Sequence, residues 1–578
     1  MSKVFEYMRP YAGMLAVAFV LLTFEAYCAL ILPGFMADIV NDGVLTGHIP
    51  VIWRNGAFML LITMLAMTSA LITGFFTART ATGVANDMRE AVFNKVLRFS
   101  NAEINNFSTS SLITRTTNDI VQVQNTLMMA IRLLIYAPIL GIGGIIRAMD
   151  RSETLTWVIA IATLVMISTM VTLFIIVLPK FKIVQSLIDR LNLVSRENLS
   201  GILIVRAFNT QVFEKNRFDK ANKDLADTNL FVDQTFAVMF PAIMLILNLT
   251  TAFVVWIGAR EASAFRIDIG DIFAFLQYGM LIIFAFLMVA IMLVMLPRAV
   301  VSAGRIKEVL EAEGSIKYKK DPIPLPKNLK GTLEFRQVSF RYPDALETDD
   351  NVLTDISFKA EPGKTTAIIG ATGAGKTSVF KLILRFFDVT GGGIFLDGLD
   401  IRDIHKEDLH DKIGYVPQKA VLFSGSIRSN LLYADKNASE KRIIEAVETS
   451  QSKGFIESKE EGYEANVAQG GTNFSGGQRQ RLSIARALVK KAKIYMFDDS
   501  FSALDLKTDA NLRAALRQKM GGSTILIVAQ RISSIMDADQ IVVLDQGKVA
   551  GLGTHEELLG SCSVYKEIAA SQLSEEEM

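Results

Sequence analysis

The chain has 578 residues, of which 51% are hydrophobic and only 21% are charged. Soluble domains carry about 25% charged residues, so this composition excludes a disordered, collagen-like or ordinary soluble protein. The 60 basic residues balance the 59 acidic ones. Because such a chain has no overall field that would attract nucleic acid, we expect no nucleic-acid partner. Two cysteines, Cys28 and Cys562, are too few for a disulfide framework or a metal cluster.

The apolar excess is confined to the first half of the chain, where long runs with few charges recur. Each run approaches or exceeds the ~20 residues that cross ~30 Å of hydrocarbon. Six runs in succession argue against a soluble core. The sequence therefore predicts six transmembrane helices in a lipid bilayer, at residues 13–39, 56–77, 126–146, 155–178, 236–258 and 272–296.

Basic residues are distributed unequally between the two sides of this predicted bundle. The connection between the second and third helices holds five Lys or Arg residues at 79–115, and the next connection on the same side holds nine at 180–223. The loops on the opposite side hold only Arg54, then Arg147 and Arg151, then Arg260 and Arg266. Because loops rich in Lys and Arg stay in the cytoplasm, we expect both chain ends to be cytoplasmic. The basic connections are long and helix-like, which predicts helices that extend well past the membrane surface.

Two charged residues lie inside predicted membrane helices, Glu25 in the first and Arg132 in the third. A charge in the membrane is costly unless it faces water or a partner, so both are candidates for a transport pathway. The alternative is that they pair structurally or lie near a helix end. The last two helices are rich in Phe and Met, which suit varied apolar or amphiphilic small-molecule ligands, although packing against lipid is the favoured explanation.

The pattern changes after the last membrane run. We expect a transmembrane domain with cytoplasmic helical extensions at 1–315, a proline-rich linker at 316–330, and a separate domain at 331–578. In the last part short β-branched strands alternate with amphipathic helices, which indicates an α/β domain. The predicted fold class is thus a polytopic α-helical membrane domain with six transmembrane helices followed by an α/β phosphate-loop domain.

A phosphate loop directly follows the predicted strand 365–369 and opens the helix that begins at Ser378. Its glycines allow backbone N–H groups to surround phosphates, Lys376 reaches the β and γ oxygens, and the Thr377 hydroxyl can bind Mg²⁺. A second buried strand, 493–498, ends in Asp498, which suits the Mg²⁺ role opposite Thr377. We therefore expect a phosphate chain and Mg²⁺ to bind here, with the loop residues Gly370, Thr372, Gly373, Ala374, Gly375, Lys376, Thr377 and Ser378.

A third motif lies just upstream of that strand and resembles the signature of ATP-binding cassette (ABC) proteins: Phe474, Ser475, Gly476, Gly477 and Gln478. The resemblance implies that Tyr342 stacks on adenine, that Gln418 belongs to the loop that contacts Mg²⁺, and that residues 502–505 form the loop at the dimer contact. Six spans followed by one cassette resemble a bacterial half-exporter of the cell membrane. Residues 111–119 and 197–208 resemble its cytoplasmic coupling segments.

Two positions depart from the family pattern. The residue after Asp498 is normally a glutamate that acts as general base, but here it is Asp499; the switch histidine is replaced by Gln530. A base must come within about 2.6–3.2 Å of its proton donor, so a carboxylate that is shorter by one methylene is expected to lose most of its effect. The amide of Gln530 cannot supply the charge states of an imidazole.

Both losses fall in one composite site while the binding motifs remain. In this family two cassettes hold two nucleotides between the phosphate loop of one chain and the signature of the other, so a second half-transporter is expected. The pairing of Asp499 with Gln530 resembles the degenerate subunit of bacterial heterodimeric multidrug exporters, which implies a partner with a competent catalytic site. Two alternatives stay open: a slow homodimeric exporter, and an ATP-gated regulatory subunit that moves no substrate.

Overall fold

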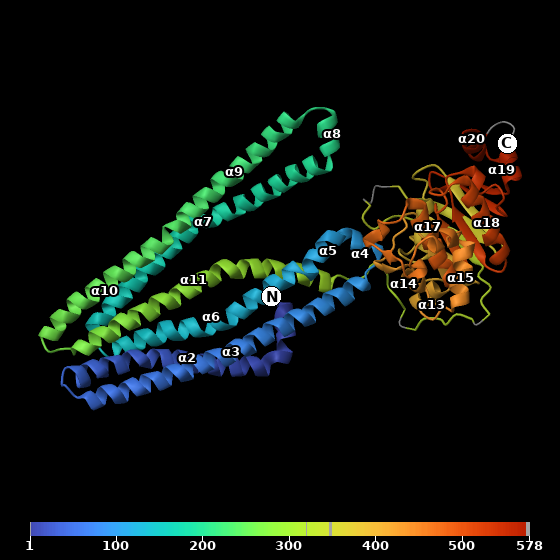
Figure 1. Cartoon of the computed structure of the whole chain (residues 1–578). Helices are drawn as coiled ribbons and strands as arrows, with labels where there is room; N and C mark the ends of the chain where they lie inside the picture. The colour runs from blue at the N-terminus through green and yellow to red at the C-terminus, as the bar shows by residue number, and fades with distance from the viewer. Residues whose placement is uncertain (1, 320, 327, 346–349, 574–578) are drawn as a thin grey trace. The chain divides into compact units, whose positions relative to one another are not determined.

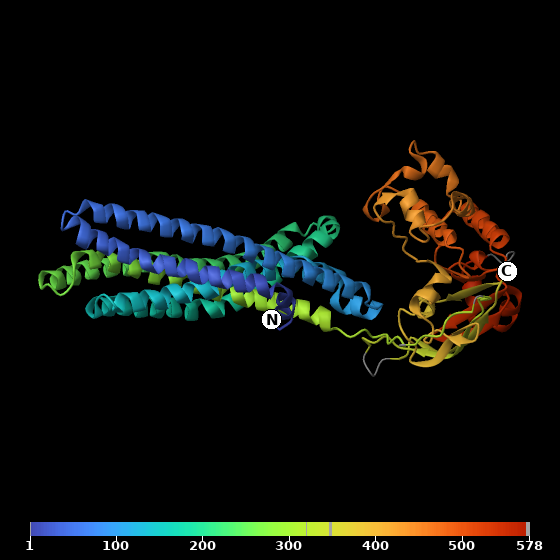
Figure 2. The ribbon, with the colours of Figure 1, turned by 90° about the horizontal axis from the view of Figure 1, so that it is seen from below.

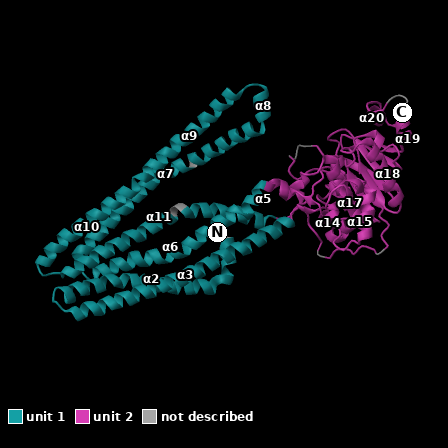
Figure 3. Ribbon diagram, in the orientation of Figure 1, with its two compact units in different colours: residues 1–97, 110–312 teal, residues 98–109, 313–578 magenta. Residues whose placement is uncertain are grey.

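The computed structural model describes residues 2–319, 321–326, 328–345 and 350–573. The chain forms two compact units (Figure 3). Unit 1 comprises Met1–Leu97 and Ser110–Ala312, and unit 2 comprises Arg98–Thr109 and Glu313–Met578. The twelve residues Arg98–Thr109, which connect two helices of unit 1, therefore belong to unit 2. The division expected from the sequence placed them in the transmembrane domain.

Unit 1 is entirely helical, and its longest helices are those expected from the apolar runs. Within the described residues six helical stretches are long and apolar enough to cross a membrane: Lys3–Val44, Ile49–Leu97, Thr109–Met149, Glu153–Ser200, Gln211–Ser263 and Ile269–Glu311. Their helices are α1 (Ser2–Met8), α2 (Ala12–Asp38), α3 (Ile49–Leu97), α5 (Thr109–Thr116), α6 (Asn118–Met149), α7 (Glu153–Ser200), α9 (Gln211–Ala237), α10 (Met239–Ser263) and α11 (Ile269–Glu311). The predicted six-helix membrane domain is confirmed.

The long helices exceed the thickness of a bilayer. Helix α3 has 49 residues and α7 has 48, whereas about 20 residues cross the hydrocarbon. More than half of each helix therefore lies outside the hydrocarbon, and the polar end of α3 carries Arg89 and Lys95. Helices α2, α3, α6 and α11 pack against one another along most of their length.

Helices α7 and α9 form a hairpin that diverges from α6 and α11 toward its tip, where the short helix α8 (Ile202–Ala207) connects them (Figure 1). Helix α8 packs chiefly on its own hairpin. Large apolar side chains at this tip are two-thirds or more exposed: Leu199, Leu203, Phe208, Val212 and Phe213. Exposed apolar side chains are thus gathered at one end of the hairpin, whereas single ones scattered over a surface are common.

The opposite end of unit 1 is tied together by charged side chains from three connections. Arg151 contacts Asp271 with Nη1 to Oδ1 at 2.9 Å and Asp38 with Nη2 to Oδ1 at 3.5 Å. All three tryptophans of the chain, Trp53, Trp157 and Trp256, lie toward this end and are exposed. Exposed tryptophans collect where a bilayer meets water, so they are consistent with a membrane boundary at this end.

The described residues of unit 2 form three sheets, and the largest has six strands in the order β12-β11-β3-β10-β9-β6. All neighbours in it are parallel except β11 and β12. Its strands are β3 (Thr365–Gly370), β6 (Ile413–Val416), β9 (Ile494–Asp498), β10 (Thr524–Val528), β11 (Gln540–Asp545) and β12 (Lys548–Gly553). An antiparallel sheet has the order β2-β1-β4-β5, with β1 Leu333–Phe340, β2 Leu353–Ala360, β4 Gly391–Leu396 and β5 Leu399–Asp400; β7 (Gly425–Ser426) pairs with β8 (Asn466–Val467).

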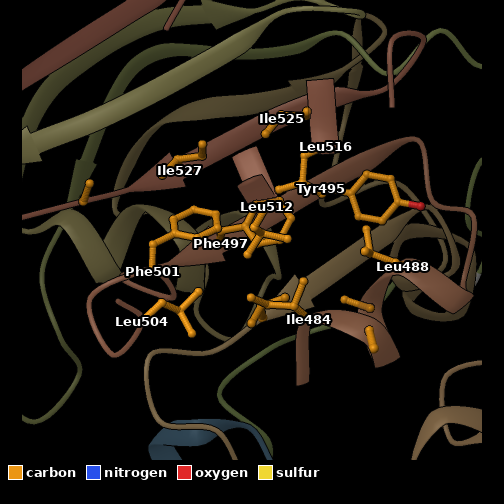
Figure 4. Packing of buried hydrophobic residues seen from close by; sticks show 14 of the residues in the cluster. Ile484, Leu488, Tyr495, Phe497, Phe501, Leu504, Leu512, Leu516, Ile525 and Ile527 are labelled. Carbon is orange, nitrogen blue, oxygen red and sulfur yellow. The ribbon is translucent and has the colours of Figure 1, made fainter. Parts of the chain in front are cut away.

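The main helices of unit 2 contribute to two hydrophobic cores on opposite faces of the six-stranded sheet. They are α12 (Lys376–Ile383), α13 (Lys406–Asp411), α14 (Ile427–Leu432), α15 (Glu440–Thr449), α16 (Lys453–Glu457), α17 (Gly476–Val489), α18 (Leu506–Lys519), α19 (His555–Ser561) and α20 (Ser563–Ala570). Successive side chains of a strand point to opposite faces. In β9, Tyr495 and Phe497 accordingly pack with α17 and α18 (Figure 4), whereas Ile494 and Met496 pack with α12 and the antiparallel sheet.

The segment Arg98–Thr109 is joined by Glu103 to the residues just after helix α11. This residue belongs to the short helix α4 (Asn101–Phe107), visible from below in Figure 2, and is buried. Its two carboxylate oxygens accept hydrogen bonds from the backbone N–H groups of Ser100 and Ser315, each at 2.7 Å. The hydroxyls of Ser100 and Ser315 also lie 2.8 Å apart. Glu103 thus fastens α4 to residues that precede the cassette.

Candidate nucleotide site

The candidate site lies at the carboxyl ends of four adjacent parallel strands. The phosphate loop follows β3, Asp498 ends β9, and the segments after β10 and β6 carry Gln530 and Gln418. Because these strands are neighbours in the sheet, their end residues meet at one edge. They enclose a cavity of about 330 Å³ lined by Tyr342, Val352, Thr372, Gly373, Gly375, Lys376, Thr377, Ser378, Gln418, Asp498, Asp499, Val528 and Gln530.

The phosphate loop depends on glycine at two positions. Gly375 precedes α12 with φ +93°, a left-handed conformation that glycine adopts readily. A Cβ on Gly370, whose φ is +158°, would lie 2.1 Å from the carbonyl oxygen of Leu544. Gly370 and Ala374 support the loop from behind and do not line the cavity, unlike the other loop residues of the motif.

Lys376 supplies the positive charge of this cavity. Its Nζ donates hydrogen bonds to the carbonyl oxygens of Gly370 and Ala371, both at 2.8 Å. Burial lowers the pKa of Lys376 below its ordinary 10.5, although the charges of Asp499 and Asp498 act in the opposite direction. A partly desolvated ammonium beside the free N–H groups of a helix N-terminus suits an anionic phosphate chain.

Asp498 and Thr377 lie together as expected for a Mg²⁺ site. The Thr377 hydroxyl is 3.2 Å from Oδ1 of Asp498. Burial raises the pKa of Asp498; the Thr377 hydroxyl lowers it, the charge of Asp499 raises it, and a hydrogen bond from Tyr415 lowers it again. Two adjacent carboxylates, one of them buried, leave negative charge that a divalent cation would balance, and the oxygen donors match those that Mg²⁺ prefers. The residues therefore fit Mg²⁺, with Thr377 and Asp498 as holders.

Tyr415 is a member of this group that the sequence analysis missed. It lies in β6, three residues before Gln418, and is partly buried. Burial and the neighbouring Asp498 raise the pKa of its hydroxyl, so it stays protonated and donates to the carboxylate. The available signal was its position in the strand next to β9, where the side chain at the strand end meets Asp498.

Asp499 is the acceptor of two amide hydrogen bonds at a strained backbone position. Its Oδ2 receives the Nε2 donors of Gln530 at 2.8 Å and Gln418 at 3.2 Å. Its φ is +48°, in the left-handed region that few residues with a side chain adopt. A backbone N–H bond to the carbonyl of Val528, at 2.9 Å, and a bond from the Ser502 hydroxyl to the Asp499 carbonyl, also at 2.9 Å, hold this conformation.

Tyr342 borders the other end of the cavity. Its hydroxyl is 2.9 Å from the Ser378 hydroxyl, Lys381 donates to it at 3.3 Å, and its ring packs edge-on against Phe340 and Phe387. The side chain of Lys381 also lies over the ring, 5.4 Å from its centre. Tyr342 is thus held beside the start of α12, where its ring flanks the phosphate loop.

The motif from Phe474 to Gln478 lies outside this cavity. Ser475 caps α17: its hydroxyl accepts the N–H of Gln478 at 3.3 Å, and the side chain of Gln478 accepts the N–H of Ser475 at 3.0 Å. Phe474 is buried beneath, whereas Ser475 and Gly476 are exposed. A Cβ on Gly476 would meet nothing within 4 Å. The helix start therefore faces open space, accessible to another molecule.

Comparison with known proteins identifies the chain. The family model for the ABC transporter transmembrane region matches residues 15–286, and the ABC transporter model matches residues 353–502. An uncharacterized ABC transporter ATP-binding protein of Mycobacterium tuberculosis is 40% identical over 570 residues, which cover 98% of this chain and 97% of that protein. The chain belongs to the ABC transporter family.

Other relatives of this ABC transporter span its whole length. The ATP-dependent lipid A-core flippase of Pseudomonas aeruginosa is 31% identical, over 99% of this chain and 96% of that protein. A solved structure, described as a bacterial Atm1-family ABC exporter with ATP bound, is 23% identical, covers 98% of this chain and 99% of its own, and has a TM-score of 0.79. This chain therefore has the fold of an exporter half-transporter, a membrane domain fused to its cassette, and is a multi-pass membrane protein.

The two charges inside the membrane part of the ABC transporter form a pair. Nη2 of Arg132 lies 2.8 Å from Oε1 of Glu25, and the guanidinium lies over the Tyr136 ring at 5.8 Å. The side chain of Glu25 is 8% exposed and that of Arg132 is 49% exposed. Oε2 of Glu25 is buried and has no hydrogen-bond partner among the described residues. The pair thus joins α2 to α6 and presents a cation at the helix surface.

Proposed function

We propose that this chain is the degenerate-site subunit of a heterodimeric ABC exporter that moves amphiphilic molecules, drugs or lipid-like compounds, out of the cytoplasm or the inner leaflet of a bacterial membrane. Its cassette would hold ATP and Mg²⁺ with the residues that line the cavity. The observation that carries the proposal is the environment of Asp499, the residue at the position of the general base.

Both amides that face Asp499 donate to the same carboxylate oxygen, Oδ2. The two N–H bonds engage the lone pairs of Oδ2, so this oxygen is not free to accept a hydrogen bond from an attacking water. Its side chain is also one methylene shorter than glutamate, and general-base catalysis contributes typically 10²–10⁴-fold. We infer that the site retains ATP and hydrolyses it slowly.

A second chain would complete the assembly. The exposed start of α17 at Ser475 would close the partner's competent site, and the exposed apolar tip at α8 would be covered by the partner. The apolar side chains exposed at the α8 tip support this arrangement, because a cluster of that kind is usually covered by another protein. Hydrolysis at the partner's site would then reset a transporter that ATP binding has closed.

The orientation follows the basic residues. Both termini and the cassette would lie in the cytoplasm, because the loops rich in Lys and Arg are those near α4, α5 and α8. The exposed Trp53, Trp157 and Trp256 would mark the outer interface. The Glu25–Arg132 pair would belong to the substrate pathway, since an exposed guanidinium between apolar helices is retained where it meets water or a polar headgroup.

The experiment is vectorial transport. Inverted membrane vesicles that contain the chain, alone or with a candidate second half-transporter encoded by the same organism, are supplied with ATP and a fluorescent amphiphile. The proposal predicts uptake only with both chains. Uptake by this chain alone would indicate the homodimeric alternative, and ATP binding without uptake of any amphiphile in either preparation would favour a regulatory subunit.

A further inference from the structure

The end of the chain holds the loop that carries Gln530. The side chain of Gln572 accepts the backbone N–H of Ile532 with Oε1 at 2.8 Å and donates Nε2 to the backbone carbonyl of Gln530 at 2.9 Å. The primary amide thus presents a donor and an acceptor to the backbone, as a neighbouring strand would. Residues 530–532 follow β10 without a strand partner of their own there, so Gln572 satisfies backbone groups that the sheet leaves free.

Helix α20, which precedes Gln572, is held firmly in the core. Gln572 comes two residues after the end of α20, whose Tyr565 and Ala569 are fully buried in the core. The hydroxyl of Tyr565 lies 2.7 Å from Nδ1 of His555 in α19, and the backbone N–H of Gln572 donates to the carbonyl of Ala569 at 3.0 Å. Because α20 is anchored in this way, the amide of Gln572 is delivered from a fixed position.

A chain of contacts connects Gln572 to the reaction centre. Gln572 holds the backbone of Gln530; the side chain of Gln530 donates to Asp499 at 2.8 Å, and both Gln530 and Asp499 line the nucleotide cavity. Gln572 itself does not line the cavity. Any effect that it has on nucleotide is therefore indirect, through the backbone of residues 530–532, of which Gln530 is the residue that lines the cavity.

We propose that Gln572 is a positioning residue of the nucleotide site: the C-terminal segment sets the place of the Gln530 amide and thereby how long the site retains ATP. A displaced C-terminal segment would release the 530–532 backbone and with it the Gln530 amide, which lines the cavity and donates to Asp499. The inference rests on the proposed binding of ATP in this cavity and is independent of the proposed heterodimer and of the rate of hydrolysis.

The test is a double-mutant cycle on the full chain in lipid. The rate of release of a fluorescent ATP analogue is measured by displacement with unlabelled ATP, for the unmodified chain and for Gln572→Ala, Gln530→Ala and the double variant. One or two lost hydrogen bonds predict release faster by about three- to tenfold for Gln572→Ala. If Gln572 acts through Gln530, the same change has no further effect in the Gln530→Ala chain.

Two controls separate positioning from stability. Ser571→Ala removes a neighbouring exposed hydroxyl that, among the described residues, bonds the Ile568 carbonyl, and it should leave release unchanged. Gln572→Glu keeps the acceptor for Ile532 and loses the donor to Gln530, so it should reproduce the faster release even if Gln572→Ala folds poorly. Unchanged release in Gln572→Glu, or an undiminished effect of Gln572→Ala without the Gln530 side chain, would overturn the inference. Failure of the unmodified chain to bind the analogue would instead overturn the proposed function.

Discussion

Gln530 donates its Nε2 hydrogen to Oδ2 of Asp499 over 2.8 Å, from the segment after β10 to the residue after β9. The two departures from the family pattern are therefore partners in one hydrogen bond. Each suits the other: the amide supplies a donor that needs no proton exchange, and the short carboxylate lies within its reach. A change at either position alone removes this hydrogen bond, so a variant designed to restore hydrolysis should change both residues together.

The raised pKa of Asp498 predicts that Mg²⁺ binding depends on pH. Burial raises this pKa, so protons compete with the cation at a higher pH than for an exposed aspartate. Without metal, the folded chain favours the protonated form of Asp498, so the free energy of unfolding decreases as pH rises through the raised pKa. A salt-bridged aspartate has the opposite effect, because its pKa is lowered in the folded chain. Calorimetric titration with Mg²⁺ and ATP should show weaker Mg²⁺ binding toward acid.

Tyr415→Phe is the matched variant for this experiment. Loss of the hydroxyl bond that lowers the pKa of Asp498 should move the pH dependence upward. Asp498→Asn should remove the pH dependence together with most of the Mg²⁺ affinity. If the Mg²⁺ affinity of Asp498→Asn decreased toward acid as much as that of the unmodified chain, another group would be responsible for the pH dependence.

Two glycines of the phosphate loop should respond differently to alanine. In Gly370→Ala the new Cβ meets the Leu544 carbonyl at 2.1 Å, so the β3 and β11 backbones must separate. We expect a loss of about 3 kcal/mol or more in unfolding free energy. In Gly373→Ala nothing lies within 4 Å, and only the left-handed φ of +87° costs roughly 1–2 kcal/mol. Denaturant unfolding compares the two, and equal losses would contradict the proposed role of the Leu544 contact.

Much of the site was predictable because its chemistry is local. The phosphate loop, Asp498 and Gln530 each follow a short buried strand, and parallel strands bring such ends together. The membrane helices were predictable because a bilayer demands long apolar runs. Contacts that depend on distant packing were not: Ser315 and Glu103 are 212 residues apart in the chain, and Gln572 and Gln530 are 42 apart. No periodicity marks these residues, and their roles arise only from the folded arrangement.

The Glu103 contact should stabilise unit 2 at neutral pH and lose this effect in acid. Although burial acts to raise it, hydrogen bonds from Ser100 and Ser315 hold the pKa of Glu103 below its ordinary 4.5. Its contribution is therefore present above about pH 4.5 and is lost as pH falls through the lower folded value. Glu103→Ala should lower the unfolding free energy by ~1–3 kcal/mol at neutral pH.

Asn106→Ala, at an exposed position of the same helix, is the control for Glu103. Thermal unfolding of the full chain in detergent would compare the variants at neutral pH and near pH 4. The account would be contradicted if both substitutions cost the same, or if the loss from Glu103→Ala were undiminished in acid.

The charge pair in the membrane should influence transport and leave ATP binding unchanged. Arg132→Gln leaves Glu25 buried without a partner, and Glu25→Gln leaves the guanidinium with an amide, so each should reduce amphiphile transport by about tenfold or more. Uptake into vesicles and binding of the ATP analogue are measured side by side. The exchanged pair Glu25→Arg with Arg132→Glu is the control for a purely structural role. If it fully restored transport, the pair would serve helix packing and would not belong to the substrate pathway.

The most direct measurement of the central claim is steady-state ATP hydrolysis by the purified chain in lipid, unmodified and with Asp499→Glu plus Gln530→His. The account predicts negligible turnover by the unmodified chain, with ATP still bound, and a rise of roughly 10²-fold or more in the double variant because the longer carboxylate and the imidazole restore the base and its partner. Turnover near the enzyme median of ~10 s⁻¹ by the unmodified chain would contradict it and would establish that Asp499 is a sufficient base.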